Sequence, residues 1–195
     1  MQAMKLCVYV MTCDAGFAPN LFWGYCTLAT CTPNHKRCDL KKGDWIVGHN
    51  TKAERNRLIY AMQLTEDPMT LDEYYHDRRF ERKRPTQGTW QQRCGDNVYS
   101  LNDNGVYRQD NNAEYHRTFR LRRIDTYGDR VFVSKHFYYF GANPVLIPQR
   151  FVRLIKREQG VSYHYDGIVG RFVDWLEENH RRGRRSLPRD LCGGC

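Results

Sequence analysis

Alternating apolar and polar positions predict strands in the first third of the chain. The segment from Lys5 to Met11 alternates and is rich in Val and Tyr, which favours a first, central strand. The turn residues 41–44 lead into a second strand at Trp45–Gly48, and the apolar run Arg57–Thr65 predicts a third. The polar loop at 50–56 fits a long hairpin between these last two strands.

Helical spacing of apolar residues occurs later in the chain. A helix is predicted from about Leu71 to Phe80, with Thr70 as its N-cap. A second helix is predicted over Ile168–His180, because four apolar residues repeat there at helical intervals. Shorter strands are expected at Asn97–Leu101, Val131–Val133 and Phe137–Phe140.

Strands therefore outnumber helices, and their order favours the α+β class. We expect a small mixed β-barrel or a strongly curved sheet with peripheral helices. The length of 195 residues suits one domain, which we assign to residues 1–180. We interpret the polar region 85–125 as a long insertion or lid, and we expect residues 181–195 to form a flexible basic tail.

The stretch from Gly16 to Arg37 is too apolar for a solvent-exposed loop without a function, and Gly and Pro interrupt it too often for one helix or strand. It holds four aromatic residues and two cysteines. We interpret it as one wall of a site, facing Asp44-Trp45 and Tyr139-Phe140. The alternative is that many of these rings only pack in the core.

The net charge of +9 is unevenly distributed. Residues 1–77 hold 8 Lys and Arg and 9 Asp and Glu, whereas residues 78–195 hold 23 and 13. A basic half indicates a polyanionic partner, because Lys and Arg displace counterions from phosphates. The candidate phosphate contacts are Lys36, Arg37, Arg78, Arg79, Arg82, Lys83, Arg84, Arg122 and Arg123. For any single cluster, a solvated surface is the alternative.

A base held between aromatic rings would also need polar groups that read its edge. The candidate ligand-binding residues combine both kinds: Phe17, Asn20, Trp23, Tyr25, Asp44, Trp45, Asp96, Asn97 and Tyr139. An alternative role for Asp44 is a turn in which its carboxylate accepts hydrogen bonds from backbone N–H groups.

No catalytic residue can be assigned, because no recognised catalytic signature is present. Cys26, Cys31, His35 and Cys38 cluster at irregular spacing, and Cys192 and Cys195 form a single pair. Zinc sites usually show two close pairs, so we expect no metal and no cofactor. No apolar run is long enough to span a membrane, and the N-terminus does not resemble a signal peptide. A cytoplasmic protein with mostly reduced thiols is expected.

Several short motifs spread over residues 5–180 resemble one family. They are Gly16-Phe17-Ala18-Pro19-Asn20, Cys26-Thr27-Leu28-Ala29-Thr30-Cys31, Gly43-Asp44-Trp45-Ile46-Val47-Gly48, Gly95-Asp96-Asn97-Val98-Tyr99 and Tyr139-Phe140-Gly141. Together they resemble the group called nucleotide modification associated domain, type two, which is proposed to act in systems that make or handle modified DNA bases. The Gly43-Asp44 turn and the aromatic helix after Pro68 also resemble the PUA-like superfamily, in particular its EVE branch. That resemblance implies a small β-barrel holding a base in an aromatic pocket.

The leading hypothesis is a protein that recognises a modified base or nucleotide, in a DNA-modification or phage-defence system. Its partner would be a nucleic acid, DNA rather than RNA, or a modified nucleotide, with no membrane involved. Two alternatives stay open. One is an enzyme of modified-nucleotide metabolism, a transferase or hydrolase, and the other is an accessory protein that works through protein contacts. The sequence does not indicate an oligomeric state.

Overall fold

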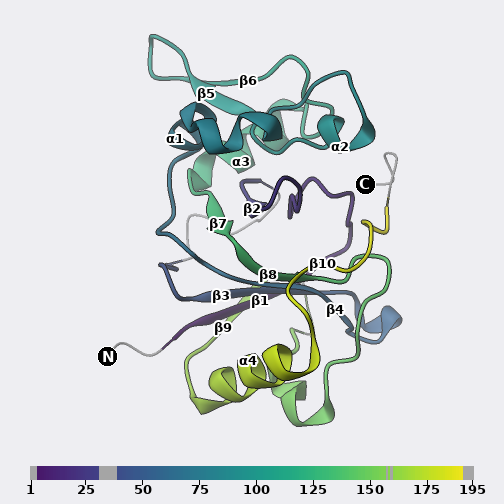
Figure 1. Ribbon diagram of the computed structural model, residues 1–195. Coiled ribbons are helices and arrows are strands. Elements are labelled where there is room, and N and C mark those ends of the chain that lie inside the picture. Colours follow the sequence, from purple (N-terminus) through teal and green to yellow (C-terminus); the bar gives the residue numbers. More distant parts are fainter. Residues whose placement is uncertain (1–3, 31–38, 157, 159, 191–195) are drawn as a thin grey trace.

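A six-stranded sheet crosses the middle of the molecule, with a helical layer on one face and a mixed layer on the other (Figure 1). The computed structural model describes residues 4–30, 39–156, 158 and 160–190. The strand order is β10-β8-β4-β3-β1-β9. The strands span Leu6–Val10 (β1), Trp45–His49 (β3), Leu58–Gln63 (β4), His136–Tyr139 (β8), Val161–His164 (β9) and Gly183–Arg184 (β10). β1 runs parallel to β3 and β10 parallel to β8, and the other neighbours are antiparallel.

The lower layer consists of helix α4 (Gly167–Asn179) and the 3-10 helix η4 (Gln149–Leu154). Asp166 caps α4, because its side chain accepts a hydrogen bond from the Ile168 N–H at 3.1 Å. The apolar face of α4 packs with Phe151 and Leu154 against the Leu6, Val8 and Trp45 side of the sheet. This helix and its face are those that the sequence predicts.

The upper layer contains two small sheets and several short helices. β2 (Cys26–Leu28) pairs with β7 (Phe132–Ser134), and β5 (Tyr99–Leu101) pairs with β6 (Tyr107–Gln109). Its helical elements are α1 (Leu71–His76), η3 (Arg78–Lys83), α2 (Trp90–Arg93) and α3 (Phe119–Gly128), while η2 (Lys52–Glu54) joins β3 to β4. The Thr70 N-cap is confirmed, since its side chain accepts from the Glu73 N–H.

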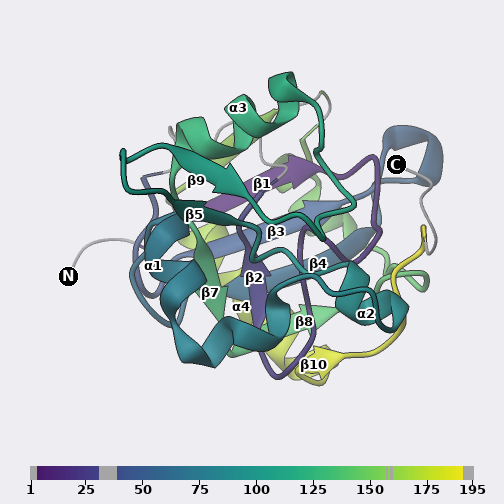
Figure 2. The same ribbon diagram turned by 90° about the horizontal axis from the view of Figure 1, so that it is seen from above.

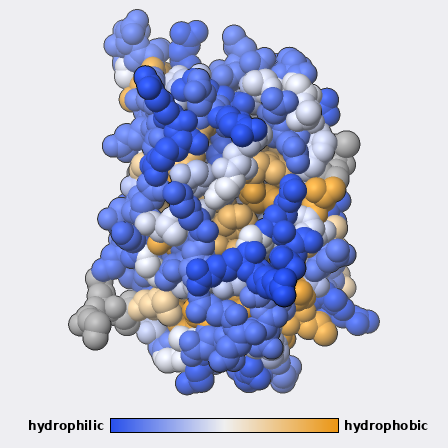
Figure 3. Space-filling view, in the orientation of Figure 1, coloured by the Kyte–Doolittle hydropathy of each residue, from blue (hydrophilic) through white to orange (hydrophobic). Residues whose placement is uncertain are grey.

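The expected PUA/EVE-like β-barrel is wrong, because the sheet is open and does not close on itself. A barrel has one packed interior, whereas both faces of this sheet are buried. Along β1, Leu6 and Val8 face α4, while Cys7 and Tyr9 face the upper layer. On the surface, Figure 3 shows hydrophilic residues over most of one face, with apolar residues emerging mainly near its middle and towards the lower layer.

The end of the chain returns to the sheet. We expected a flexible tail from residue 181, but Gly183 and Arg184 form the edge strand β10 beside β8. Further on, the Asp190 N–H donates to the Asp14 carbonyl at 2.9 Å. Within the described residues, no helix combines the length and the apolar character needed to cross a membrane.

Candidate functional site

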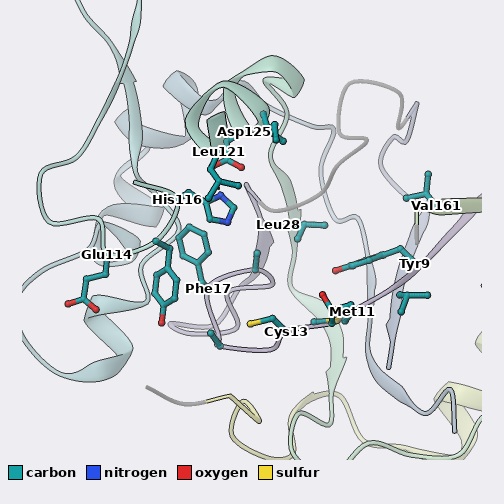
Figure 4. A pocket seen from close by; sticks show the side chains of 17 residues that line it. Tyr9, Met11, Cys13, Phe17, Leu28, Glu114, His116, Leu121, Asp125 and Val161 are labelled. Atoms are coloured by element: carbon teal, nitrogen blue, oxygen red, sulfur yellow. The ribbon is translucent and has the colours of Figure 1, made fainter. Parts of the chain in front are cut away.

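A cavity of about 750 Å³ lies between helix α3 and the β1–β9 edge of the sheet. Its lining comes from β1 and the segment after it, from β2, from residues 114–125 and from the start of β9 (Figure 4). Figure 2 shows α3 on the same side of the molecule as β9 and β1, away from β8 and β10. The volume is in the range typical of small-molecule sites.

Aromatic rings form one wall of this cavity. Phe17 stacks on Tyr115 with ring centres 4.7 Å apart and an angle of 20° between the planes. The His116 ring meets Phe17 edge-on at 5.4 Å (Figure 4). Phe17 is buried behind this stack, so the half-buried Tyr115 ring is the flat surface on which a nucleobase could stack.

A histidine–carboxylate pair lies at the same wall. His116 Nδ1 is 2.7 Å from Asp125 Oδ2, and the same oxygen accepts a hydrogen bond from the Tyr99 hydroxyl at 2.8 Å. His116 has a φ of 55°, in the left-handed region that histidine tolerates better than most residues. Gln109 Nε2 donates to the Tyr115 and His116 carbonyls at 3.1 and 3.4 Å. The imidazole is therefore held in one orientation at the cavity.

Opposite this wall lie Tyr9 of β1 and Met11, which follows β1, together with Leu28 of β2 and Val161 of β9 (Figure 4). The Tyr9 hydroxyl lies 2.7 Å from the Tyr60 hydroxyl. The cavity is thus mostly apolar, with a few polar groups from different segments, which is the usual composition of a ligand site.

A buried lysine lies in the upper layer, away from the cavity lining. Lys83 Nζ donates to Asn20 Oδ1 at 2.6 Å, to the Asn20 carbonyl at 3.0 Å and to the Tyr25 carbonyl at 3.1 Å. Burial lowers the pKa of Lys83 to about 8. The lysine thus holds the segment 20–25 in place from within.

Asp96 is buried near the same group. Its carboxylate accepts hydrogen bonds from the Thr27 hydroxyl at 2.6 Å and the Tyr74 hydroxyl at 2.8 Å. Burial raises the pKa of Asp96, while the Lys83 ammonium opposes that rise. The neighbouring Asn97 donates from Nδ2 to the Tyr74 and Phe80 carbonyls. These groups join α1, η3 and β2.

Comparison with family models decides the relationship. The model described as nucleotide modification associated domain 2 matches residues 3–194. The chain belongs to this family. No curated protein and no solved structure matches it. The resemblance seen in the sequence motifs is thereby confirmed, and the family description links this nucleotide modification associated domain to nucleotide modification systems.

The structure distributes the predicted aromatic residues of this domain over several places. Phe17 lines the cavity. Trp45 is fully buried on the α4 face of the sheet, and Tyr139 is fully buried on the opposite face, where its hydroxyl donates to Asp14 at 2.6 Å. Trp23 and Tyr25 are half-buried and do not line the cavity.

The polar residues that were predicted to contact the edge of the base also lie outside the cavity lining. Asn20, Asp96 and Asn97 are fully buried in the network around Lys83 and Tyr74. Asp44 accepts hydrogen bonds from the backbone N–H groups of Lys5 and Lys41 at 2.9 and 3.0 Å. The turn role considered for Asp44 is therefore confirmed.

The predicted phosphate contacts separate into three groups. Lys36 and Arg37 lie outside the described residues. In the run after α1, Arg78 is exposed, but Arg79 is paired with Glu66 and Asp77. The rest of that run is engaged as follows: Lys83 is buried, Arg82 lies over the Trp23 ring at 5.7 Å, and Arg84 lies over the Tyr75 ring at 4.2 Å.

Arg122 and Arg123, the third group, are exposed on α3. No ion pair or hydrogen bond engages their guanidinium groups within the described part of the chain. They lie on the helix whose other residues Leu121, Ile124 and Asp125 line the cavity.

Sequence reasoning missed Tyr115, His116 and Asp125. These residues fall in the region 85–125, which shows no clear periodicity. The spacing of nine residues between His116 and Asp125 matches no motif, because α3 and an irregular turn bring them together. The cluster of arginines from Arg117 to Arg123 was the only signal in the sequence that pointed to this segment.

The thiols show one further difference of environment. Cys7, Cys26 and Cys94 are buried thiols, whereas Cys13, at the cavity, is disulfide-bonded. Burial raises the pKa of Cys26 to about 12, so this thiol stays protonated and packs as a small apolar residue. The other residues of the candidate zinc cluster lie outside the described residues.

Proposed function

We propose that this domain binds the base of a nucleotide, in particular a modified base, in the cavity between α3 and the β1–β9 edge. The observation that carries the proposal is the Phe17–Tyr115 stacked pair on the wall of a 750 Å³ cavity. The rings supply stacking, and the hydroxyl of Tyr9 and the His116–Asp125 pair supply polar groups for the edge of the base. Such a protein would serve a DNA-modification or phage-defence system, with a nucleic acid or a modified nucleotide as its partner.

The pocket residues of this proposal differ from most of those expected from the sequence. Phe17 is retained, and Arg122 and Arg123 remain the proposed phosphate contacts because they are exposed beside the cavity. The buried residues Trp45 and Asn20 act instead through the packing that holds the cavity walls.

Titration calorimetry with free nucleotides tests the proposal. A nucleotide with a modified base is expected to bind more tightly than its unmodified counterpart. Tyr115→Leu removes a stacking surface and should weaken binding by about 5-fold or more, since stacking contributes about 1–3 kcal/mol per base. Tyr25→Leu is the matched control, because this half-buried ring lies outside the cavity and contacts Phe80 instead.

Two outcomes would contradict the proposal. Equal affinity for modified and unmodified nucleotides would exclude recognition of the modification. Equal losses in Tyr115→Leu and Tyr25→Leu would exclude this cavity as the site. Circular dichroism of both variants confirms that each is folded.

A second candidate, an enzyme acting on a nucleotide, is favoured by one specific observation. His116 is at the cavity, and a carboxylate that itself accepts from Tyr99 fixes its ring. Such a pair suits general acid–base chemistry. Turnover of a bound nucleotide that is lost in His116→Gln, with binding retained, would support an enzyme over a binding protein.

A further inference from the structure

Helix α3 exposes almost all of its outer surface. Of its ten residues only Asp125 is buried. Phe119 is 75% exposed and Tyr127 is 66% exposed, which are the largest values among the exposed aromatic residues of the described chain. Two rings this exposed on one short helix give a surface that a partner can cover.

The two rings and an arginine form one stripe along the helix. Phe119, Arg123 and Tyr127 are spaced four residues apart, so they lie on the same face. With a rise of about 1.5 Å per residue, the stripe is roughly 12 Å long. Arg120 lies next to it, and both arginines are exposed.

The charged side chains exposed at the start of α3 and just before it are positive. Arg117, Arg120, Arg122 and Arg123 occur within seven residues, and the nearest acid, Asp125, is buried against His116 and Tyr99. No ion pair or hydrogen bond holds the guanidinium groups of Arg120, Arg122 or Arg123 within the described ranges. A polyanion is therefore the complementary partner.

We propose that the outer face of α3 binds a single-stranded nucleic acid. Bases stack on Phe119 and Tyr127, and phosphates contact Arg120, Arg122 and Arg123. A single strand fits better than a duplex, because a duplex keeps the faces of its bases stacked on one another. A membrane surface fits less well, because rings and arginines share one stripe here, whereas an interfacial helix separates its apolar and basic faces.

The position of α3 connects this surface with the cavity. Leu121, Ile124 and Asp125 line the cavity, while the stripe faces solvent on the other side of the same helix. A strand that follows α3 can thus deliver one of its bases to the cavity. This part of the inference rests on the proposed function. It identifies the ligand of the cavity as a base within a polynucleotide.

Fluorescence anisotropy with a labelled oligothymidylate of about 12 nucleotides tests the stripe. The wild-type protein should bind this single strand more tightly than a duplex of the same length. The double variant F119A/Y127A should weaken single-strand binding by about 10-fold or more, since each ring stacks one base. The matched control is Tyr165→Ala, which removes a ring that is 53% exposed and is not part of α3.

A salt series tests the arginines. Replacing Arg120, Arg122 and Arg123 by Gln should reduce the slope of log affinity against log salt by about 2, because each phosphate contact on a single strand contributes about 0.7. Arg171→Gln on α4 is the control, and it should leave the slope unchanged.

The F119A/Y127A variant separates this inference from the proposed function, because neither ring lines the cavity. It should bind a free nucleotide in the cavity as the wild type does. Oligonucleotide binding equal to that of the wild type in both sets of variants would overturn the inference, as would equal binding of duplex or preferential binding of anionic lipid vesicles. Failure of the wild type to bind any free nucleotide would overturn the proposed function alone.

Discussion

At the scale of single residues, one buried charged side chain, Lys83, holds a neighbouring segment in place. Lys83 is 1% exposed, and its ammonium group has three acceptors in the segment 20–25. The lysine lies in a sequence run that reads as a surface basic patch, Arg82-Lys83-Arg84. Arg82, its neighbour on the same 3-10 helix, is exposed, so Lys83 is the structural residue of the patch and not a phosphate contact.

Lys83→Met tests this structural role. The substitution keeps the approximate length of the side chain but removes the Lys83 donor from the Tyr25 carbonyl, while the Asn20 oxygens keep the donors Thr27 and Phe22. A buried acceptor without a donor costs about 1–3 kcal/mol, so we expect the free energy of unfolding to fall by about that amount. Urea denaturation measures it. Lys42→Met, at an exposed lysine, should change it by less than about 0.5 kcal/mol. A loss under about 1 kcal/mol in Lys83→Met would contradict the role.

At the scale of elements, α4 and η4 form the second core under the sheet. Phe172 of α4 packs against Phe151 of η4 and Trp175, with ring centres 5.5 Å apart in both pairs. These rings cover the face of the sheet that carries Trp45. An open sheet with apolar residues on both faces needs such a layer on each face. The lower layer therefore fixes the sheet whose opposite face carries the cavity.

Phe172→Ala is expected to destabilise the whole protein and not only α4. Removing a buried phenylalanine ring costs about 3–5 kcal/mol through lost burial and the cavity that remains. Chemical denaturation followed by far-UV circular dichroism measures the loss, and exposed Arg171→Ala on the same helix is the matched control. A separate early transition of α4 in Phe172→Ala, with the sheet unaffected, would contradict the expectation.

At the scale of the whole molecule, the segment that follows β1 is joined to residues 189–190, which are far away in the sequence. The Asp14 N–H donates to Asp190 Oδ2 at 2.8 Å, and the Asp14 carboxylate accepts from the Tyr139 hydroxyl at 2.6 Å. Asp14 follows Cys13, which lines the cavity, so this junction anchors the segment that carries Phe17. Burial raises the pKa of Asp14, although the Tyr139 hydroxyl opposes the rise.

This raised pKa predicts how Asp14→Asn depends on pH. The folded wild type holds the Asp14 proton more tightly than the unfolded chain does, so its contribution to stability is complete below the ordinary pKa of 3.8. That contribution is lost as the pH rises through the raised pKa, and Asn has no such loss. The unfolding free energy of Asp14→Asn minus that of the wild type should therefore increase as the pH rises above about 4, by at most about 1.4 kcal/mol per pH unit.

Denaturation of both proteins across this range measures the difference. Asp103→Asn is the control for replacing a carboxylate by an amide at an exposed position. A difference that decreases with rising pH in Asp14→Asn would mean that the carboxylate form is favoured by folding.

Local patterns were sufficient for the strongly periodic elements. The alternation of Lys5–Met11 and the apolar run Arg57–Thr65 became β1 and β4, and the spacing of apolar residues gave α4 within one residue at each end. These segments carry their own signal, because one face or both faces must be buried. Residues 149–154 and 161–164 gave no comparable signal, and η4 and β9 depend on contacts with distant parts of the chain.

The sequence by itself determined the family, the positions of the main strands along the chain and the basic character of the second half. It could not determine which rings share a cavity, because neighbouring strand residues point to opposite faces and the register decides which face is which. Only the tertiary structure separated Trp45 from Phe17, buried Lys83 and Asp96, and brought His116 to Asp125. Those outcomes depend on long-range packing, and no local pattern encodes it.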